Sequence, residues 1–316
     1  MSRKRKFAKP FDLGHVILFN DYPKIYTKSI GVPGKFVKKI NRRVHLKDGT
    51  GGEMDSAYIA DPDYRLLFEK AAVCLEHQSL PVGDEKLHKI GDYDIQLVVD
   101  EHLPTLMAIA SKEDVRKSKR LLKRTPSDLT ELYFLDLGEE NIRKRLSTVK
   151  KIIDSNQYLT DENALNLGII ALYAPTAHAC EITEEVVNLY QKVADSLDVK
   201  MQSCLYSLLS VMIDAYFDEE NEYRRLMKMI DEKTSSESKY ISGAQEAILE
   251  SLRYAKEDLD IANGKLAKTN EELANYKDKL AKTNGELAKT NGDLAKSQEK
   301  IAKLQAEVER LKANGK

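Results

Sequence analysis

The order of apolar and polar positions divides the chain into three stretches. Up to about residue 137, short apolar runs alternate with polar turns, a pattern typical of strands mixed with a few helices. From 138 to 232, apolar positions recur at the spacing of an α-helix in successive segments. After a polar linker, leucines recur every seven residues. The pattern therefore predicts an α/β core at 10–137, an α-helical subdomain at 138–232, and a linker with a coiled coil at 233–316.

The first stretch predicts an α/β sandwich around a mixed sheet. Runs of apolar residues bounded by Gly, Pro and Asp predict strands, and longer amphipathic runs predict helices. In chain order, the expected elements are a helix at Phe11–Lys28, strands at Arg43–Leu46, Met54–Ala60 and Ala71–Ser79, a helix from Asp84 to Pro104, and strands at Thr105–Ala110 and Leu132–Leu135. We expect the last of these strands at the edge of the sheet or next to it.

The final stretch has one apolar residue at every seventh position, from Leu259 to Val308. A sustained seven-residue spacing predicts a left-handed coiled coil. If the leucines occupy d positions, asparagines such as Asn263 and Asn270 occupy a positions, where they favour a parallel dimer but lower its stability. If the leucines occupy a positions, threonines fall at d. We expect a homodimer with a weak seam, the alternative being a single marginal helix.

Composition and cysteine spacing limit the class of protein. The 316 residues are enough for one sizeable core with accessory segments. The three cysteines are far apart and form no CxxC pair, which predicts neither a disulfide framework nor a zinc site and favours a reducing, cytoplasmic location. No apolar run typical of a signal peptide follows the basic start, and the longest apolar runs are too short to cross a bilayer. We therefore expect no membrane partner.

Polar residues stand at the ends of the two strands that flank Asp61-Pro62-Asp63. Asp55 opens the first strand, and Glu76 and Gln78 close the second. Because side chains alternate along a strand, Glu76 and Gln78 should project to one face and His77 to the other. If the strands pair antiparallel, the end of the second returns beside the start of the first. Two carboxylates and an amide oxygen would then converge.

Such a cluster suits a divalent metal ion. Neighbouring carboxylates repel one another unless a cation is present, and oxygen ligands favour Mg²⁺ or Mn²⁺ over zinc. The expected metal ligands are Asp55 and Glu76, with Glu53 as a spare ligand two residues before Asp55. The alternative interpretation is a β-hairpin with polar residues at its solvated ends.

These residues also resemble a nuclease motif. Asp55, followed after twenty residues by Glu76-x-Gln78, resembles the signature of the PD-(D/E)XK nuclease superfamily. The run Glu76-His77-Gln78-Ser79 is similar to the Glu-His-Gln-Ser run of its branch of recombination-promoting nucleases (Rpn) and transposase-like proteins. The resemblance covers roughly 10–137 and implies a restriction-endonuclease-like core that hydrolyses DNA with Mg²⁺ or Mn²⁺. Its catalytic residues would be Asp55, Glu76 and Gln78. Gln78 replaces the lysine usual in the superfamily, and any upstream acidic ligand would have to be Asp12 or Asp21.

Basic residues near these strands are candidates for binding phosphates. The chain has a formal net charge of −1, but its first 125 residues are basic and the remainder acidic. Cations gathered on one surface give salt-dependent affinity for nucleic acid, although a solvated surface explains them equally well. The candidates are Lys38, Lys39, Arg42, Arg43, Lys112, Arg116, Lys117, Lys119, Arg120, Lys123 and Arg124.

These observations support one leading hypothesis and two alternatives. The first is a metal-dependent DNA phosphodiesterase, endonuclease-like and associated with recombination or transposition, in which a coiled-coil dimer presents two sites. The second is a catalytically inactive protein on a nuclease fold that binds nucleic acid or acts as a scaffold. The third is a coiled-coil assembly factor for which the globular part is cargo.

Overall fold

A computed structural model describes residues 7, 9–45, 51–63, 70–78, 84–112, 121–125, 128–240 and 243–314. The chain forms two units, Met1–Ser251 and Leu252–Lys316. The first is a mixed α/β unit and the second is helical. The α/β class expected from the apolar pattern is therefore confirmed.

Strands and helices alternate in the first part of the chain, and helices follow. The elements up to residue 136 are α1 (Pro10–Asp21), α2 (Pro23–Ser29), β1 (Lys35–Lys39), β2 (Arg43–His45), β3 (Gly51–Glu53), β4 (Ser56–Asp61), β5 (Ala71–Gln78), α3 (Asp84–Glu101), β6 (Thr105–Ser111), β7 (Leu121–Thr125) and β8 (Asp128–Asp136). The later ones are α4 (Glu139–Asp154), α5 (Asp161–Leu172), α6 (Ala179–Val193), α7 (Val199–Tyr216), α8 (Glu220–Lys233), α9 (Ser236–Tyr240) and α10 (Gly243–Asn314), with 3₁₀ turns at Thr176–His178 and Ala194–Ser196.

Six strands form one mixed sheet in the order β1-β4-β5-β6-β8-β7. The pairs β1/β4, β4/β5 and β7/β8 are antiparallel, whereas β5/β6 and β6/β8 are parallel. Parallel neighbours need a crossover connection, and α3 supplies it between β5 and β6. Among the described residues, the short strands β2 and β3 pair with each other and form a second sheet.

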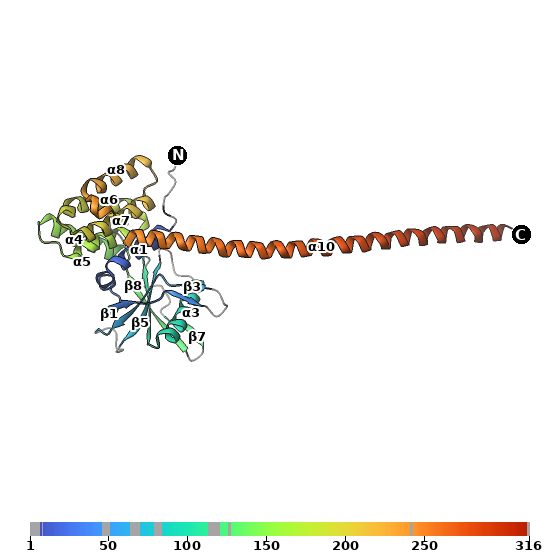
Figure 1. Ribbon diagram of the computed structural model, residues 1–316, viewed down its shortest axis with the longest axis horizontal. Coiled ribbons are helices and arrows are strands. Elements are labelled where there is room, and N and C mark those ends of the chain that lie inside the picture. Colours follow the sequence, from blue (N-terminus) through green and yellow to red (C-terminus); the bar gives the residue numbers. More distant parts are fainter. Residues whose placement is uncertain are drawn as a thin grey trace. The chain divides into compact units, whose positions relative to one another are not determined.

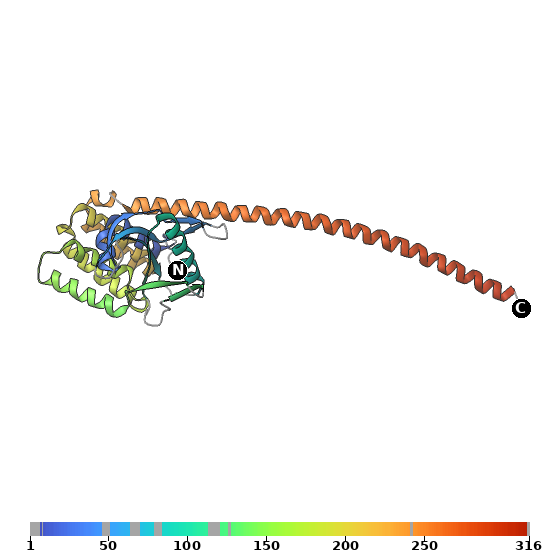
Figure 2. The ribbon, with the colours of Figure 1, turned by 90° about the horizontal axis from the view of Figure 1, so that it is seen from below.

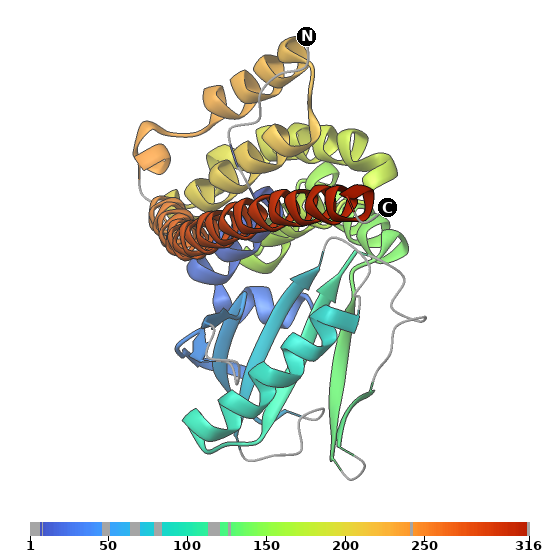
Figure 3. The same ribbon diagram turned by 90° about the vertical axis from the view of Figure 1, so that its right-hand side faces the viewer.

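The two faces of the large sheet are covered differently. The apolar residues of α3, including Ile90 and Leu97, are spaced to fall on one helix face, and they pack with Cys74 and Met107 of the sheet. Figure 3 shows α3 lying across this face. The next residue of β5, Leu75, belongs to the larger core on the opposite face, where the sheet packs against α1, α5 and α7. Helices α4–α8 gather on that side (Figure 1).

Leu208 of α7 packs between two glycines of neighbouring helices. A Cβ atom on Gly168 of α5 would lie 2.6 Å from Cδ2 of Leu208, and one on Gly14 of α1 would lie 2.9 Å from its Cδ1. Both distances are shorter than real carbon contacts, so the absence of a side chain at these glycines is what lets α1 and α5 approach α7. Leu208 is completely buried there.

The helices expected between 139 and 232 are confirmed, and three expectations are corrected. The helix at Phe11–Lys28 is two helices, because Pro23 has no N–H to continue α1 and instead begins α2. Residues 121–125 form strand β7, which pairs with β8 and which was not among the expected elements. Within the expected linker, Ser236–Tyr240 form α9, and the Ser238 hydroxyl donates to Gln202 Oε1 of α7 at 3.1 Å.

Helix α10 is continuous over 72 residues (Figure 2). Its heptad leucines form an exposed stripe, with Leu266 and Leu280 both about 60 % exposed. The expected helix is therefore present, while the homodimer remains a prediction. Among the described residues, no helix is long and apolar enough to cross a membrane.

Candidate functional site

Strand pairing brings Asp55 and Glu76 together, as the sequence predicted. In the antiparallel pair β4/β5, Ser56 lies opposite Leu75, so the start of β4 is beside the end of β5. The Asp55 backbone N–H donates to Glu76 Oε1 at 3.1 Å, and the His77 backbone N–H donates to Asp55 Oδ2 at 2.7 Å. The Glu76 carboxylate thus accepts a hydrogen bond from the backbone of Asp55, and the Asp55 carboxylate accepts one from the residue after Glu76. Both carboxylates are therefore fixed at one end of the strand pair.

Glu76 and His77, which are consecutive in β5, face opposite sides of the sheet. Glu76 contacts α3, whereas His77 Nδ1 lies 3.2 Å from the Tyr173 hydroxyl at the end of α5. This alternation confirms the expected separation of Glu76 from His77. Gln78 ends β5, is half-buried, and pairs in register with Ser111 of the parallel strand β6.

Lys86 is a member of this site that the sequence did not indicate. Its ammonium group donates to Glu76 Oε2, and the Cys74 thiol lies 3.6 Å from Glu76 Oε1. Lys86 is the third residue of α3, and the crossover that begins after β5 places this first helical turn near the end of the strand. The sequence feature that could have indicated this residue is a lysine in the first turn of the helix that follows the strand containing Glu76.

Burial and like charge dominate the electrostatics of the carboxylates. Burial, and then the negative charge of Asp55, raise the pKa of Glu76 to about 7, against the opposing effect of Lys86. Burial by itself lowers the pKa of Lys86, but Glu76 and Asp55 raise it above its usual value. The site therefore combines a carboxyl group that titrates near neutral pH with a lysine that stays charged.

The stability of the protein should depend on the protonation of Glu76. Its pKa is higher in the folded chain than the ordinary value of 4.5, so the folded state binds this proton more tightly. The stabilisation is complete below about pH 4.5 and is lost as the pH rises through about 7. Relative to Glu76→Gln, which cannot titrate, the wild-type free energy of unfolding should fall between about pH 5 and pH 7. Urea unfolding of both proteins across this range measures the effect, and a pH-independent difference would contradict it.

Asp12 is the upstream acidic residue that lies near the pair. It is exposed on the first turn of α1, and desolvation by the surrounding protein, followed by the negative charge of Asp55, raises the pKa of its carboxyl group. Asp21 lies elsewhere: it is beside the Cys204 thiol of α7, where burial and then Asp21 raise the thiol pKa. Of the two candidates from the sequence, Asp12 is therefore the one that interacts with Asp55.

Glu53, the expected spare ligand, does not lie on the strand that follows Asp55. It belongs to β3 in the small sheet and forms an ion pair with Arg42, with Glu53 Oε1 3.1 Å from Nη2. Among the residues that the structure describes, no three or more His, Cys, Asp or Glu side chains are grouped so that they could hold a metal ion. The metal site therefore remains a prediction based on Asp55 and Glu76.

The candidate phosphate-binding residues are distributed over several elements. Lys38 and Lys39 lie on β1, Arg42 follows it, and Arg43 begins β2. Lys123 and Arg124 belong to β7, and Arg116, Lys117, Lys119 and Arg120 lie outside the described residues.

Lys112 is held by aromatic side chains. Its Nζ donates to the Tyr216 hydroxyl at 2.7 Å and lies 4.0 Å from the centre of the Phe11 ring. Burial lowers its pKa to about 7. These contacts turn the ammonium group toward α1 and α7.

A chain of buried polar side chains lies on the helical side of the sheet, behind the carboxylates. His15 Nε2 is 2.7 Å from Ser56 Oγ, and His15 Nδ1 is 2.8 Å from the Tyr26 hydroxyl. The Tyr26 hydroxyl is 2.8 Å from that of Tyr173, which in turn contacts His77. Burial lowers the pKa of His15 to about 4 and that of His77 well below its usual value, so both rings are neutral at physiological pH. The chain links the residue after Asp55 to the residue after Glu76.

Comparisons of the chain with protein-family models, with curated proteins and with solved structures found no match.

Proposed function

We propose that the protein is a metal-dependent phosphodiesterase that cleaves DNA. The observation that supports this most strongly is the pair of adjacent carboxylates, Asp55 and Glu76, fixed by backbone hydrogen bonds and contacted by Lys86. Acidic and basic groups held together at a strand end are suited to binding a metal ion and a phosphate at the same point. The resemblance of the Glu76–Ser79 run to nucleases is what favours DNA as the substrate.

Asp55 and Glu76 fit Mg²⁺ or Mn²⁺ in charge and in ligand type. Mg²⁺ is commonly bound by one or two carboxylates, with waters and substrate phosphate oxygens as its other ligands. The repulsion that raises the pKa of Glu76 is the kind that a bound cation removes. Such an ion, when bound, polarises a phosphodiester oxygen and lowers the pKa of its bound water.

The other residues of the site would position the substrate. Lys86 stays protonated and can move from Glu76 to a phosphate oxygen as negative charge develops there. Gln78, at the end of the same strand as Glu76, would orient the attacking water through its amide. Lys38, Lys39, Arg42 and Arg43 would bind the DNA backbone.

Incubation with plasmid DNA tests this proposal. The full chain is expected to nick or linearise supercoiled plasmid in the presence of Mg²⁺ or Mn²⁺, and EDTA is expected to stop the reaction. Absence of cleavage with either metal would contradict the proposal.

A second candidate function is DNA binding without catalysis. The ion pair between Lys86 and Glu76 favours it, because one carboxylate oxygen already has a charged partner. In that case the protein would bind plasmid equally well with and without a metal ion and leave it intact.

We also propose that α10 forms a parallel homodimer. The most apolar part of its exposed stripe is Ile301, Leu304 and Val308. In the register that places the heptad leucines at a, Ile301 and Val308 are β-branched residues at a and Leu304 is a leucine at d, the arrangement that favours parallel pairs. Ile301→Asp with Val308→Asp should therefore convert a dimer into a monomer, as measured by light scattering after gel filtration. Lys296→Asp with Lys303→Asp is the matched control, because both lysines lie off the stripe. A wild-type monomer would contradict the proposal.

A further inference from the structure

The buried polar side chains on the helical side of the sheet form a closed path with the Asp55 carboxylate. The members of this polar network are, in order, Ser56, His15, Tyr26, Tyr173 and His77, and each is hydrogen-bonded to the next. Ser56 directly follows Asp55 in the chain, and the backbone N–H of His77 donates to Asp55 Oδ2. The start of β4 and the end of β5 are therefore joined by a closed ring of hydrogen bonds and covalent bonds.

Strand pairing alone does not fix Asp55 and Glu76 relative to each other. Strand β4 begins at Ser56, and its pairing with β5 ends where Ser56 lies opposite Leu75. Asp55 therefore precedes the paired region, whereas Glu76 and His77 continue beyond it and pair with β6 on their other side. On the side of β4, the two strand ends are connected by the carboxylate hydrogen bonds and by the polar network.

All members of the polar network are shielded from water. His77 is 3 % exposed, and the other four side chains are completely buried. A buried polar group that loses its partner is left unsatisfied, and this costs more free energy than the hydrogen bond itself contributes. The hydrogen bonds of the network therefore resist opening, and the strand ends that they join are held rigidly.

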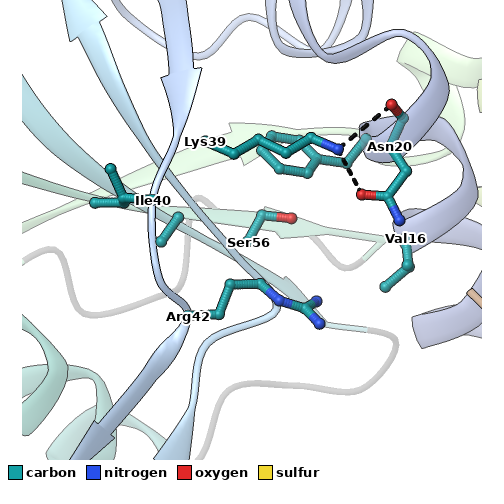
Figure 4. A pocket seen from close by; sticks show the side chains of 8 residues that line it. Val16, Asn20, Lys39, Ile40, Arg42 and Ser56 are labelled. Carbon is teal, nitrogen blue, oxygen red and sulfur yellow. Dashed lines mark hydrogen bonds between the residues drawn. The ribbon is translucent and has the colours of Figure 1, made fainter. Parts of the chain in front are cut away.

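The polar network also connects the strand ends to three helices. His15 lies on α1, Tyr26 on α2, and Tyr173 directly after α5. Figure 4 shows the Ser56 side chain projecting from β4 toward α1. The rings of His15 and His77 stack with their centres 5.9 Å apart, which adds a direct contact between α1 and β5. The packing of these helices thus determines where both strand ends lie.

We infer that the polar network positions Asp55 and Glu76 for metal binding, with Tyr26 and Tyr173 as positioning residues that act through Ser56 and His77. Groups that orient metal ligands from behind are commonly needed for full metal affinity. Here they act through the backbone, because the His77 N–H holds the Asp55 carboxylate and the Asp55 N–H holds that of Glu76. The inference rests on the proposed metal site, but these two hydrogen bonds can be measured without a metal ion.

Amide hydrogen exchange measures how firmly the two carboxylates are held. Tyr26→Phe and Tyr173→Phe each remove one hydroxyl group and two hydrogen bonds of the polar network. In both variants the Asp55 and His77 amides should exchange at least about tenfold faster, relative to the amides that pair β5 with β6. NMR of the ¹⁵N-labelled full chain in the absence of metal resolves these amides. A general loss of stability would instead accelerate both sets of amides alike.

Tyr190→Phe is the matched control. Tyr190 of α6 is also completely buried, and its hydroxyl lies 2.7 Å from Thr234 Oγ1 at the end of α8. The substitution removes the same chemical group from the same kind of environment, but outside the polar network. The relative exchange of the Asp55 and His77 amides should therefore equal that of the wild type.

Titration with Mn²⁺ measures the consequence for metal binding. Free Mn²⁺ is followed by electron paramagnetic resonance, and Glu76→Gln gives the level of binding without the carboxylate pair. Tyr26→Phe and Tyr173→Phe should each bind Mn²⁺ about 10- to 100-fold more weakly than the wild type, whereas Tyr190→Phe should bind it equally well. Because either substitution already interrupts the path, combining the two should weaken binding by no more than about a further twofold.

Unchanged relative exchange in both single variants, an equal change in Tyr190→Phe, unchanged Mn²⁺ affinity in both single variants, or additive losses in the double variant would overturn the inference. If the wild type binds no more Mn²⁺ than Glu76→Gln does, the metal-dependent nuclease proposal fails and the exchange rates alone decide the inference. The expected exchange and affinity changes without plasmid cleavage would support the inference and contradict the nuclease proposal. Plasmid cleavage without these changes would do the reverse.

Discussion

Asp55→Asn and Glu76→Gln are each expected to lower the rate of DNA cleavage by about 100- to 1,000-fold or more, as is typical when a group that stabilises transition-state charge is removed. Each variant removes one of the two negative charges that would hold the metal ion. Each amide side chain also keeps an oxygen that can accept the hydrogen bond of the original carboxylate, from the His77 N–H at position 55 and from the Asp55 N–H at position 76. The loss should therefore reflect chemistry and not misfolding. Initial rates of plasmid nicking at saturating Mg²⁺ or Mn²⁺ measure it.

Asp61→Asn is the matched control for these variants. Asp61 ends the strand that Asp55 precedes, and its carboxylate lies 3.9 Å from Lys70 at the far end of β4. This variant should cleave at the wild-type rate. Retention of activity in Asp55→Asn or Glu76→Gln would show that the adjacent carboxylates are not the catalytic centre.

Leu208→Ala is expected to lower the free energy of unfolding by about 2–5 kcal/mol. The leucine is completely buried between Gly14 and Gly168, and neither glycine has a side chain that can fill the space left behind. The chain has 15 tyrosines and no tryptophan, so urea unfolding is best followed by tyrosine fluorescence. Val99→Ala, which truncates a side chain that is 57 % exposed on α3, should change the stability by no more than about 0.5 kcal/mol.

A second substitution tests whether the contact between Leu208 and Gly168 accounts for the lost stability. Gly168→Ala in the wild-type protein places a Cβ 2.6 Å from Leu208 Cδ2, and such overpacking typically costs about 1–3 kcal/mol. In the Leu208→Ala background the same methyl group should fill part of the cavity and cost less, because only the closer contacts with Leu18 Cδ2 and Leu205 Cδ2, both at 3.3 Å, have to relax. Additive effects of the two substitutions would show that Leu208 and Gly168 do not interact in this way.

The sequence predicted most of the helices and strands because these depend on the local spacing of apolar and polar residues. The apolar spacing within 139–232 predicted helices that the structure contains, since each buries one face against the same core. The meeting of Asp55 and Glu76 was also predictable. It needs only two strands, a turn between them and antiparallel pairing, and side-chain alternation then separates Glu76 from His77.

The parts that the sequence did not predict depend on contacts between distant segments. Lys86 reaches Glu76 only because α3 crosses the sheet, and Ser56, His15 and Tyr26 meet only because α1 packs on it. Strand β7 was missed because its Lys123 and Arg124 resemble a solvated segment, and only pairing with β8 makes it extended.

The positions of β1 and β7 in the large sheet give their basic residues a further role. Both are outermost strands, which present unpaired backbone groups to any extended chain that approaches. Lysines on such strands oppose sheet extension between molecules, because charges of the same sign would meet. Neutralising Lys35 and Lys38 together would therefore make β1 a template for aggregation, so part of the positive charge protects the monomeric sheet whatever ligand the protein binds.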